Sequence, residues 1–367
     1  MPQPLSLHGR GSEGGGVSDN LGTRRATVHD VAREAGVSLA TVDRVLNGRP
    51  GVRPETAQKV EDAIKVLDFR RDLSASLLAR ARDLRIRFLV PSGGNEFMVN
   101  LQAAIERQAH EVASQRIGVS TGAIRPLDPV DLACALDGLE ARSCDCAVIV
   151  ATEDAAVQQA VEDAARRGIT VMTLVSDLPG SRRRAFIGID NVAAGRTAAS
   201  LLGRFLPQGG NVGIVAGSLG LRDHRERLDG FLDVLRREFP RLVPIGPVEG
   251  HDEASVTGDV VTTLLAGHPD LAGLYNLGAG NAGLIHALQT GGRAGAIRVV
   301  AHELTPSTLS GLQSGAIDVV LDQSPEDEIR AAIAAARSLA SGGPGSGARE
   351  GQRRPIAIGI FLRDNLR

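Results

Sequence analysis

The feature that most constrains this fold is a regular alternation of short apolar runs with longer amphipathic stretches from Ile86 onward. The apolar runs predict strands at residues 87–90, 146–150, 169–175, 211–217, 271–277, 297–301, 318–321 and 356–361. The amphipathic stretches predict helices, among them 97–113, 154–166, 191–206 and 222–238. Such alternation is typical of α/β folds, in which doubly wound parallel sheets carry helices on both faces. About 280 residues exceed one such domain of ordinary size, so we expect two lobes.

A different pattern, TVHDVAREAGVSLATVDRVLNG, precedes the alternating region. Thr27 with Asp30 three positions later resembles a capping box at the start of a helix. Gly36 is expected to end that helix in a tight turn, and Ser38 to cap a second helix. A third amphipathic stretch follows. Two short helices joined through a glycine-containing turn are typical of the helix-turn-helix unit that binds DNA.

The second of these helices has an outward face suited to contacts with bases and phosphates. Arg44 can present two parallel donors to guanine, while Leu39 and Ala40 can pack on thymine methyl groups. An ordinary three-helix bundle with a solvated polar face is the alternative. The candidate DNA-contacting residues of this headpiece are Thr27, Ser38, Leu39, Ala40, Thr41, Asp43, Arg44 and Asn47.

The run GVSLATVDRVLNG resembles the G-V-S-x-x-T-V-S-R-V-L-N run of the lactose-repressor and galactose-repressor family of bacterial regulators. The similarity continues through VRPETAQKVEDAIKVLDF and implies a DNA-binding headpiece at residues 25–70. Palindromic operator DNA and a homodimer are then the expected partners, because two half-sites require a two-fold axis. Asp43 departs from the family, which usually has Ser there. An acidic side chain repels phosphate but accepts a hydrogen bond from cytosine N4, so the operator sequence does not carry over.

The same resemblance implies a hinge helix within residues 71–85 that enters the minor groove of the operator. Ala75 and Leu78 match its A-x-x-L core, and Leu78 would be the apolar wedge that opens a base step. Asp72 stands where the family commonly has Asn. A plain basic linker is the alternative, because so short a helix is marginal without a partner.

Charge is unevenly distributed along the chain. The net charge is −2, whereas residues 24–85 hold 13 Lys and Arg against 9 Asp and Glu. A basic end on an acidic remainder favours a polyanionic partner for that end. Residues 1–24 are rich in Gly and Ser and are expected to form a disordered tail without a secretory signal.

Three cysteines, Cys134, Cys144 and Cys146, cannot all pair, and their spacing does not fit a zinc site. We therefore expect reduced thiols, mostly buried, in a cytoplasmic protein. No apolar run approaches the roughly 20 residues that a membrane helix needs, so no membrane partner is expected.

From residue 86 the chain resembles, more weakly, the periplasmic-binding-protein-like core of the same family. The resemblance implies two lobes crossed by three strands, with the first lobe at about 86–185 and 319–341. The second lobe would comprise 186–318 and 355–367. The Gly-rich stretch SGGPGSGAREGQRRP, before the last predicted strand, is expected to be an exposed loop. A sugar, sugar acid or polyol effector is expected between the lobes, controlling a repressor of an uptake or catabolic operon.

Ligands of parallel sheets bind beyond the carboxyl ends of the strands, and this rule selects candidates independently of the resemblance. Carboxylates, amides and guanidinium groups suit a polyhydroxylated ligand, because they pair with adjacent hydroxyls. Arg225 and Asp190 are expected to converge on one ligand, whereas a helix cap or a solvated loop group is the alternative for each candidate. The candidates are Asn95, Phe97, Asp177, Asp190, Asn191, Arg225, Asn276, Asn281, Glu303 and Gln323.

The family's motifs are only partly kept in this region. Arg225 matches its R-x-R-x-x-G-F run, but its A-N-D-x-x-A segment has become NLGAGNAG, so the identity of the effector does not carry over. Gly278, Gly280 and Gly283 in that segment have G-x-G-x-x-G spacing, and Glu303 follows at the distance of a ribose-binding acid. A nicotinamide-dependent dehydrogenase is therefore an alternative.

Two observations count against a dehydrogenase. Only two predicted strands follow NLGAGNAG before the Gly-rich loop, and no catalytic constellation lies nearby. A secreted sugar-binding protein would share the core fold but would leave the helix-turn-helix unexplained. No nucleophile–base pair, H-E-x-x-H motif or P-loop is present, so we expect neither an enzyme nor a cofactor nor a metal site.

Overall fold

The computed structural model describes residues 26–46, 51–67, 83–341 and 355–366, in two units divided after Arg71. The first unit contains three helices: α1 (Val28–Ala35), α2 (Leu39–Leu46) and α3 (Pro54–Val66). Val31, Val42 and Val60, one from each helix, are fully buried against one another and form the centre of its core. Because each helix has only one apolar stripe, the three stripes are buried together and the polar faces remain outside.

The predicted helix ends of this unit are confirmed. The Thr27 hydroxyl accepts a hydrogen bond from the Asp30 backbone N–H, and the Asp30 carboxylate accepts one from the Thr27 N–H at 2.9 Å. Gly36 ends α1 at φ 64°, a left-handed conformation that glycine adopts at little cost. The Ser38 hydroxyl accepts a hydrogen bond from the Thr41 N–H at 3.2 Å and so caps α2.

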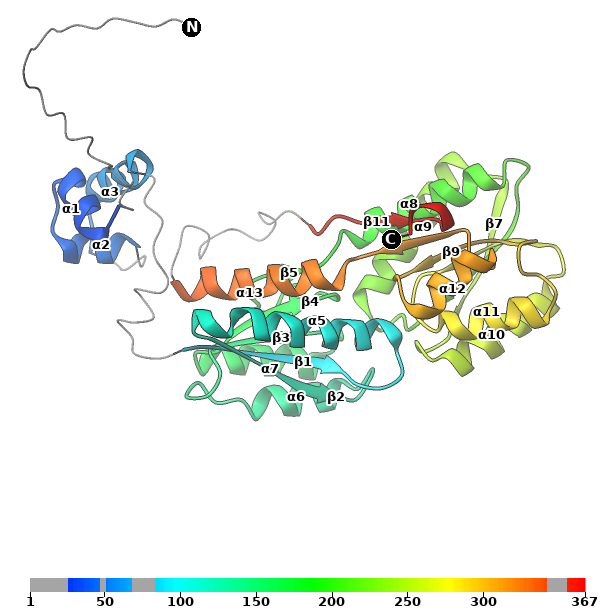
Figure 1. The fold of residues 1–367 in the computed structure, drawn as a ribbon, viewed down its shortest axis with the longest axis horizontal. Coiled ribbons are helices and arrows are strands. Elements are labelled where there is room, and N and C mark those ends of the chain that lie inside the picture. Colours follow the sequence, from blue (N-terminus) through cyan, green and yellow to red (C-terminus); the bar gives the residue numbers. More distant parts are fainter. Residues whose placement is uncertain (1–25, 47–50, 68–82, 342–354, 367) are drawn as a thin grey trace, which may run out of the picture. The chain divides into compact units, whose positions relative to one another are not determined.

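The second unit contains two sheets, which define its two lobes (Figure 1). All five strands of the first sheet are parallel, in the order β2-β1-β3-β4-β5. They are β1 (Leu84–Pro91), β2 (Ile117–Ile124), β3 (Cys146–Ile149), β4 (Thr170–Leu174) and β5 (Phe186–Ile187). The helices of this lobe are α5 (Glu96–Val112), η1 (Ala113–Gln115), α6 (Pro129–Asp137), α7 (Ala155–Arg166) and α13 (Pro325–Ser341).

Helices cover both faces of the first sheet, as the alternating pattern predicted. On one face α5 and α13 lie side by side (Figure 1), and Leu101, Ile105 and Ile329 pack with the alternate strand residues Phe88 and Val148. On the other face α6 and α7 pack against the remaining strand residues, such as Ile149. Every residue of β3 is buried, which is typical of a central parallel strand.

The second sheet has the order β11-β10-β9-β8-β6-β7. Its strands are β6 (Gly210–Ala216), β7 (Leu242–Glu249), β8 (Leu271–Asn276), β9 (Arg298–His302), β10 (Val319–Asp322) and β11 (Gly359–Phe361). The short β11 pairs antiparallel with β10, and the other pairings are parallel. The two-lobed α/β architecture with parallel sheets is thus confirmed.

Helices also cover both faces of the second sheet. One face packs against α8 (Asn191–Phe205) and α9 (Arg222–Glu238). The other packs against α10 (Ala254–Gly267), α11 (Asn281–Thr290) and α12 (Pro306–Ser314). A last turn, η2 (Arg363–Asn365), follows β11. Within the described ranges, no helix combines the length and the apolar character needed to cross a membrane.

The predicted lobe boundaries differ from the structure at two places. Residues 319–322 were expected in the first lobe, but β10 is hydrogen-bonded to β9 with Val319 opposite Val300, so it belongs to the second sheet. The chain therefore returns from the second lobe to the first after Asp322, because the apolar β10 is buried between β9 and β11 of the second sheet. Residues 186 and 187 were expected in the second lobe but pair with β4 of the first.

Sequence patterning did not predict β2 and β7, which are edge strands of their sheets. The β7 segment LVPIGPVE contains Pro244 and Pro247, and β2 alternates with Gly, Ser and Thr. An edge strand leaves one row of backbone groups unpaired, so it tolerates proline and polar residues that a central strand excludes.

Candidate functional site

The outer face of α2 is exposed, as expected for a DNA-contacting helix. Leu39, Ala40, Asp43 and Arg44 are exposed, and only Val42 among the first six residues of α2 is buried. Within the described part of the first unit, no hydrogen bond or ion pair restrains the Arg44 guanidinium.

The hydroxyl groups of Thr27, Ser38 and Thr41, which belong to the predicted interface, form hydrogen bonds within the headpiece. Thr27 and Ser38 cap α1 and α2, and the Ser38 and Thr41 hydroxyls lie 2.9 Å apart. Asn47, Ala75 and Leu78 lie outside the described residues, as do the predicted tail 1–24 and residues 71–82 of the hinge. Leu84 and Arg85, the last residues of the predicted hinge, begin β1 instead.

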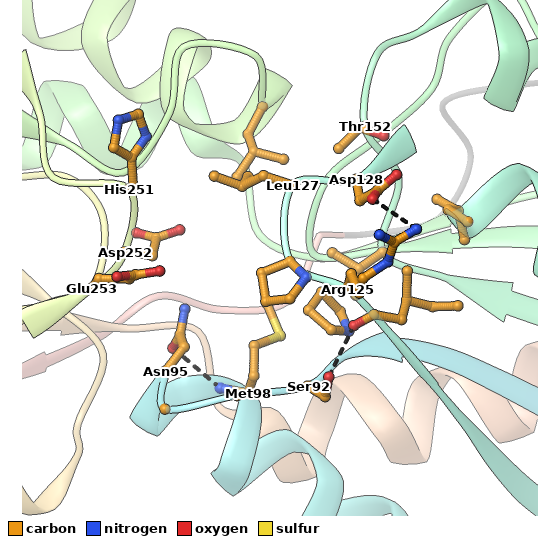
Figure 2. Close-up of a pocket in the computed structure, with 18 of the residues that line it drawn as sticks. Ser92, Asn95, Met98, Arg125, Leu127, Asp128, Thr152, His251, Asp252 and Glu253 are labelled. Carbon is orange, nitrogen blue, oxygen red and sulfur yellow. Dashed lines mark hydrogen bonds and ion pairs between the residues drawn. The ribbon is translucent and has the colours of Figure 1, made fainter. Parts of the chain in front are cut away.

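In the second unit two adjoining cavities lie where the carboxyl ends of the two sheets meet. The larger, of about 390 Å³, is lined by residues that follow β1, β2 and β3 and by residues 251–255 after β7. Figure 2 shows residues 251–253 of the second lobe and Arg125 and Asp128 of the first on opposite sides of this cavity. The smaller, of about 80 Å³, shares Asn95 and Asp252 with the larger.

Four predicted effector residues line the smaller cavity: Asn95, Phe97, Asn281 and Glu303. Asn95 also caps α5, since its side-chain oxygen accepts hydrogen bonds from the backbone N–H groups of Phe97 (3.0 Å) and Met98 (3.3 Å). Capping and cavity lining therefore coexist at Asn95, because the cap uses the oxygen and leaves the amide donors available.

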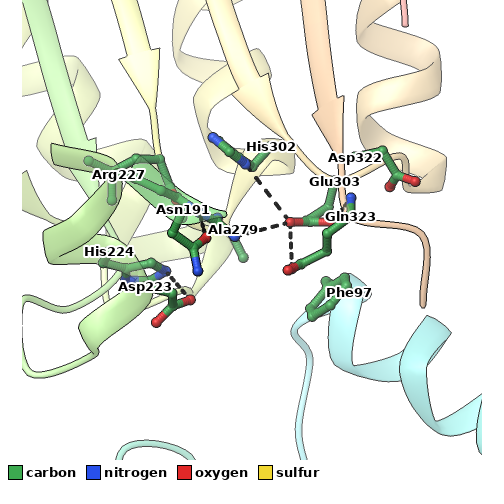
Figure 3. A network of polar contacts seen from close by, with 12 residues as sticks. Phe97, Asn191, Asp223, His224, Arg227, Ala279, His302, Glu303, Asp322 and Gln323 are labelled. Carbon is green, nitrogen blue, oxygen red and sulfur yellow. Dashed lines mark hydrogen bonds and ion pairs between the residues drawn. The ribbon is translucent and has the colours of Figure 1, made fainter. Parts of the chain in front are cut away.

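A buried polar network centred on Arg227 lies beside the smaller cavity (Figure 3). The Arg227 Nε donates to Asn191 Oδ1 at 2.8 Å, and its Nη1 donates to the Leu277 carbonyl at 2.9 Å. Its Nη2 lies 3.7 Å from Glu303 Oε1, which accepts a hydrogen bond from Gln323 Nε2 at 2.8 Å. Figure 3 shows Asn191 and Asp223 on one side of the network and Gln323 and Phe97 on the other.

Asn276 and Asn281 hold the NLGAGNAG loop. The Asn276 amide donates to Asn281 Oδ1 at 2.8 Å, and the Asn281 amide donates to the His302 carbonyl at 3.1 Å. Asn276 is fully buried, so its amide is committed to the protein rather than to a ligand. Tyr275 precedes Asn276 in β8, and its hydroxyl lies 2.8 Å from His302 Nε2.

Burial controls the protonation of this network. Loss of water around Glu303 raises its pKa to about 8, with Arg227 opposing the rise and Asp322 adding to it. Burial raises the pKa of Glu328 well above its usual range, and the charge of Glu303 raises it further. The pKa of His302 is lowered well below its usual value, first by burial and then by the positive charge of Arg227, so this imidazole is neutral.

Several buried polar atoms of the second unit have no hydrogen-bond partner among the described residues. Buried polar groups normally have hydrogen-bond partners, which ordered water or a ligand would supply here. The atoms without a partner are Thr152 Oγ1, Ser176 Oγ, Asp223 Oδ1, Arg227 Nη2, His302 Nδ1, Gln323 Oε1 and both carboxyl oxygens of Glu328.

Six predicted effector residues line neither cavity: Asn191, Asn276 and Gln323, which belong to the polar contacts described above, and Asp177, Asp190 and Arg225. Asp177 pairs with Arg183, and it accepts a hydrogen bond from the Thr173 hydroxyl at 2.6 Å. Asp190 is exposed and caps α8 through the Ala193 N–H, so the capping alternative holds there. Arg225 forms an ion pair with Glu153 of the other lobe, and the expected convergence of Arg225 with Asp190 was wrong.

The arginine of the network is Arg227, two residues along α9 from the predicted one. Successive residues of an α-helix turn by 100°, so positions 225 and 227 lie on nearly opposite sides. The inward face of α9 contains Asp223, Arg227 and Phe231 at intervals of four residues, a signal that was present in the sequence.

Glycines bring α9 close to α8 at the level of Arg227. A Cβ atom at Gly195 would overlap the Arg227 carbonyl, and one at Gly230 would overlap the Val192 carbonyl. The resulting close approach of the two helix backbones places Asn191 within hydrogen-bond distance of Arg227.

The glycines of NLGAGNAG have packing roles. A Cβ at Gly283 would overlap the Ala254 carbonyl, and one at Gly280 would overlap the Thr257 hydroxyl. The backbone N–H of Ala279, which a dinucleotide phosphate would need, instead donates to Asp252 Oδ1 at 2.7 Å. A carboxylate at this amide repels a phosphate, which counts against the dehydrogenase alternative.

Comparison with known proteins assigns both units. Residues 27–72 match the family described as "Bacterial regulatory proteins, lacI family", and residues 86–344 match the "Periplasmic binding protein domain". Catabolite control protein A of Staphylococcus xylosus and that of Priestia megaterium are each 42% identical to this chain over 80 residues. These matches cover 22% of this chain and 24% of each relative.

Solved structures match the larger unit in fold. A solute-binding protein from Burkholderia graminis superposes with a TM-score of 0.69 at 24% identity, over 78% of this chain and 97% of that one. GanP, a glucose-galactose binding protein from Geobacillus stearothermophilus, gives 0.69 at 20% identity, over 78% of this chain and 99% of its own. The chain combines a lacI-type headpiece with a periplasmic-binding-protein-like core, and it belongs to the lacI family of bacterial regulatory proteins.

Proposed function

We propose that this protein is a sequence-specific DNA-binding transcriptional regulator whose affinity for its operator is controlled by a small carbohydrate-like ligand in the cleft between its lobes. The observation that carries the proposal is the exposed outer face of α2, the second helix of a helix-turn-helix, on which Arg44 has no hydrogen bond or ion pair with any other described residue. An arginine so presented can donate two hydrogen bonds to a guanine edge in the major groove.

The proposal assigns the headpiece residues as follows. Arg44 and Asp43 read base edges, and Leu39 and Ala40 contact thymine methyl groups. Ser38, Thr41 and Asn47 contact phosphate groups, and Thr27 orients α1 through its cap. Ala75 and Leu78 enter the minor groove, with Leu78 as the wedge. Because two half-sites are read by two copies of this helix, the protein acts as a homodimer on a palindromic operator, in the cytoplasm where that DNA is.

The cleft supports the second part of the proposal. Arg227, Asn191, Glu303 and Gln323 bring donors and acceptors together in a buried site, an arrangement suited to adjacent hydroxyl groups. The Burkholderia graminis protein is described in complex with D-arabinose, and GanP is described as a glucose-galactose binding protein. We infer a sugar or polyol for this chain, and a role as repressor of the genes for its uptake or catabolism.

Contacts across the cleft couple the ligand to lobe closure. The Ser307 hydroxyl of the second lobe donates to Glu96 Oε1 of the first at 2.6 Å, and Arg222 lies 3.4 Å from Glu153. A ligand held by residues of both lobes stabilises the closed arrangement, and β1 of the first lobe follows the segment that leads from the headpiece. Ligand and operator then affect each other's binding by the same factor.

The proposal is tested by selecting binding sites from a randomised DNA pool with the full-length protein and titrating the best site by fluorescence anisotropy. A palindromic consensus bound by a dimer is expected, with an affinity that falls steeply as salt rises, because Lys and Arg side chains displace counterions from phosphates. Enrichment of no sequence, or salt-independent binding by a monomer, would refute it.

A further inference from the structure

We propose that the effector is a glycoside with an apolar aglycone: its sugar reaches into the smaller cavity and contacts Asp252, and its aglycone fills the larger cavity. The inference rests on the proposed function in taking this cleft as the effector site. It narrows the ligand from any sugar, sugar acid or polyol to a molecule with a polyhydroxylated end and an alkyl or aryl end.

The first observation is the size of the two cavities. Asn281 and Glu303 line the smaller one, but its volume of about 80 Å³ is far below the roughly 300–1,000 Å³ typical of ligand pockets. The larger cavity, of about 390 Å³, lies within that range and shares Asn95 and Asp252 with the smaller. A sugar whose hydroxyl groups reach Glu303 therefore extends past Asn95 and Asp252 into the larger cavity.

The second observation is that polar side chains of the first lobe around the larger cavity bond to their own lobe. The Arg125 guanidinium lies 3.0 Å from Asp128 Oδ2, and the Asp128 side chain also caps α6. The Ser92 hydroxyl donates to the Ile124 carbonyl at 3.2 Å. The Thr152 hydroxyl is buried and has no partner among the described residues. Few polar groups on this side of the cavity therefore remain for a ligand.

The third observation is the apolar wall of the larger cavity. Its aliphatic side chains include Met98, Ile124, Leu127, Leu132, Val150 and Leu221. In Figure 2 the side chains of Met98 and Leu127 lie between residues 251–253 of the second lobe and Arg125 of the first. Burial of an apolar group against such a wall is favourable, whereas a second sugar would lose hydrogen bonds to water there. The wall therefore favours an aglycone over a second sugar.

Leu127 differs from the rest of this wall in its backbone, which is left-handed at φ 54°. A leucine adopts this conformation only at a cost, because its Cβ crowds the following carbonyl oxygen. Residues strained in this way cluster at sites that bind ligands. The turn after β2 presents the Leu127 side chain to the cavity, so we assign to Leu127 the main contact with the aglycone.

Asp252 lies at the junction of the two cavities, since it lines both. His251 and Asp252 are left-handed, at φ 51° and 59°, and the Asp252 carboxylate packs against Gly217 and Gly278, where a Cβ atom would overlap it. Its Oδ1 accepts a hydrogen bond from the Ala279 N–H at 2.7 Å, and its Oδ2 has no partner among the described residues. A carboxylate fixed in this way can accept a hydrogen bond from a sugar hydroxyl at the point where sugar and aglycone meet.

The test is isothermal titration calorimetry on the full-length protein with matched ligands. The probes are D-glucose and D-galactose, their methyl, propyl, hexyl and phenyl glycosides in both anomeric forms, and cellobiose and lactose, in which a second sugar replaces the aglycone. We expect one series to bind progressively more tightly from methyl to hexyl, by up to about fourfold for each methylene group buried. The phenyl glycoside should also bind more tightly than the methyl glycoside, and the disaccharides more weakly than the hexyl glycoside.

Leu127→Asn is the critical variant, because asparagine keeps the approximate shape of the side chain, tolerates the left-handed backbone and is polar. It should remove most of the gain in affinity from methyl to hexyl, and Met98→Gln should do the same. Leu362→Asn is the matched control, since Leu362 is exposed and lines neither cavity. The control should keep the full gain.

Asp252→Asn should act on the sugar instead of the aglycone. Asparagine keeps an oxygen for the Ala279 N–H but replaces the available oxygen with an amide nitrogen, which cannot accept a hydrogen bond. Methyl and hexyl glycosides should both lose about tenfold or more in affinity, the factor of one hydrogen bond to a charged group. Asp259→Asn, at an exposed position of α10, should change neither affinity.

Equal affinity along the alkyl series, or a disaccharide that binds more tightly than every alkyl and phenyl glycoside, would overturn the inference and leave the proposed function intact. An undiminished gain in both Leu127→Asn and Met98→Gln, or wild-type affinities in Asp252→Asn, would do the same. Binding of no sugar, disaccharide or glycoside would contradict both the inference and the proposed carbohydrate effector.

Discussion

The guanidinium of Arg227 and the side-chain amide of Asn191 are joined by a 2.8 Å hydrogen bond between two helices, α9 and α8, and both side chains are at most 2% exposed. Gly195 and Gly230 make this contact possible, because any larger residue would separate the helix backbones. The arrangement fixes the Arg227 guanidinium beside Glu303, because Nε and Nη1 are bound to Asn191 and the Leu277 carbonyl while Nη2 lies 3.7 Å from Glu303 Oε1.

Gly195→Ala should separate α8 from α9 and lower both stability and ligand affinity. We expect a loss of about 1–3 kcal/mol in the free energy of unfolding, the usual cost of overpacking a well-packed core. Gly267→Ala is the control, because a Cβ at that helical position meets no atom within 4 Å. Urea denaturation of both variants measures the effect, and equal stability of the two would show that the helix contact is not tight.

Glu303→Gln should flatten the pH dependence of stability. The pKa of Glu303 is about 8 in the folded protein, above the ordinary 4.5. Between these values the folded state binds a proton that the unfolded state has lost, so the contribution of Glu303 to stability is greatest below pH 4.5 and is lost as pH rises to 8. The slope for one such group is at most about 1.4 kcal/mol per pH unit.

Urea denaturation at a series of pH values, with wild type and Glu303→Gln compared at each, isolates this contribution from those of other carboxyl groups. The advantage of wild type over the variant should shrink steadily toward pH 8. A difference between the two proteins that does not change with pH would mean that Glu303 is ionised when folded.

Arg44→Ala should relax base preference as well as weaken operator binding, by roughly 1–3 kcal/mol if the guanidinium pairs with one guanine. Binding to the operator and to single-base variants of it, measured by anisotropy, checks this. Arg33→Ala is the control, because Arg33 is exposed on α1 and pairs there with Asp30. If Arg44→Ala weakens all sequences equally, Arg44 contacts phosphate rather than a base.

Glu153→Gln should weaken ligand binding by a small factor, because it removes ion pairs that span the cleft to Arg222 and Arg225. These side chains are about one-third exposed, so the loss should not exceed about 1 kcal/mol. Glu162→Gln removes a comparable pair with Arg182 inside the first lobe and should leave ligand affinity unchanged. Calorimetry distinguishes the two, and an equal effect of both variants would show that closure does not depend on Glu153.

The elements that sequence patterning predicted are those governed by local chemistry. The Thr27 capping box, the Gly36 turn and the central strands depend on neighbouring residues or on burial of a whole strand, so a single sequence shows them. The edge strands β2 and β7 lack that signal, because their polar residues and prolines are typical of loops as well. The lobe to which β10 belongs depends on strand pairing, which the sequence of β10 does not specify.

The site was only partly predictable for a related reason. Residues directly after strands, such as Asn95, Glu303 and Gln323, were found because the topology of parallel sheets brings strand ends together. Arg227 required the orientation of α9, which depends on the tertiary contact between α9 and α8.

The most direct test of the whole account measures operator affinity of wild type and Arg227→Lys with and without the sugar that most raises the wild-type Tm. The lysine variant keeps the charge but loses the planar set of donors that binds Asn191 and the Leu277 carbonyl. We predict that the sugar changes the wild-type operator Kd, and that the operator changes the sugar Kd by the same factor. Arg227→Lys should bind the operator with wild-type affinity and show no response to the sugar. A variant that responds like wild type, or a wild type whose operator affinity no sugar alters, would contradict the account.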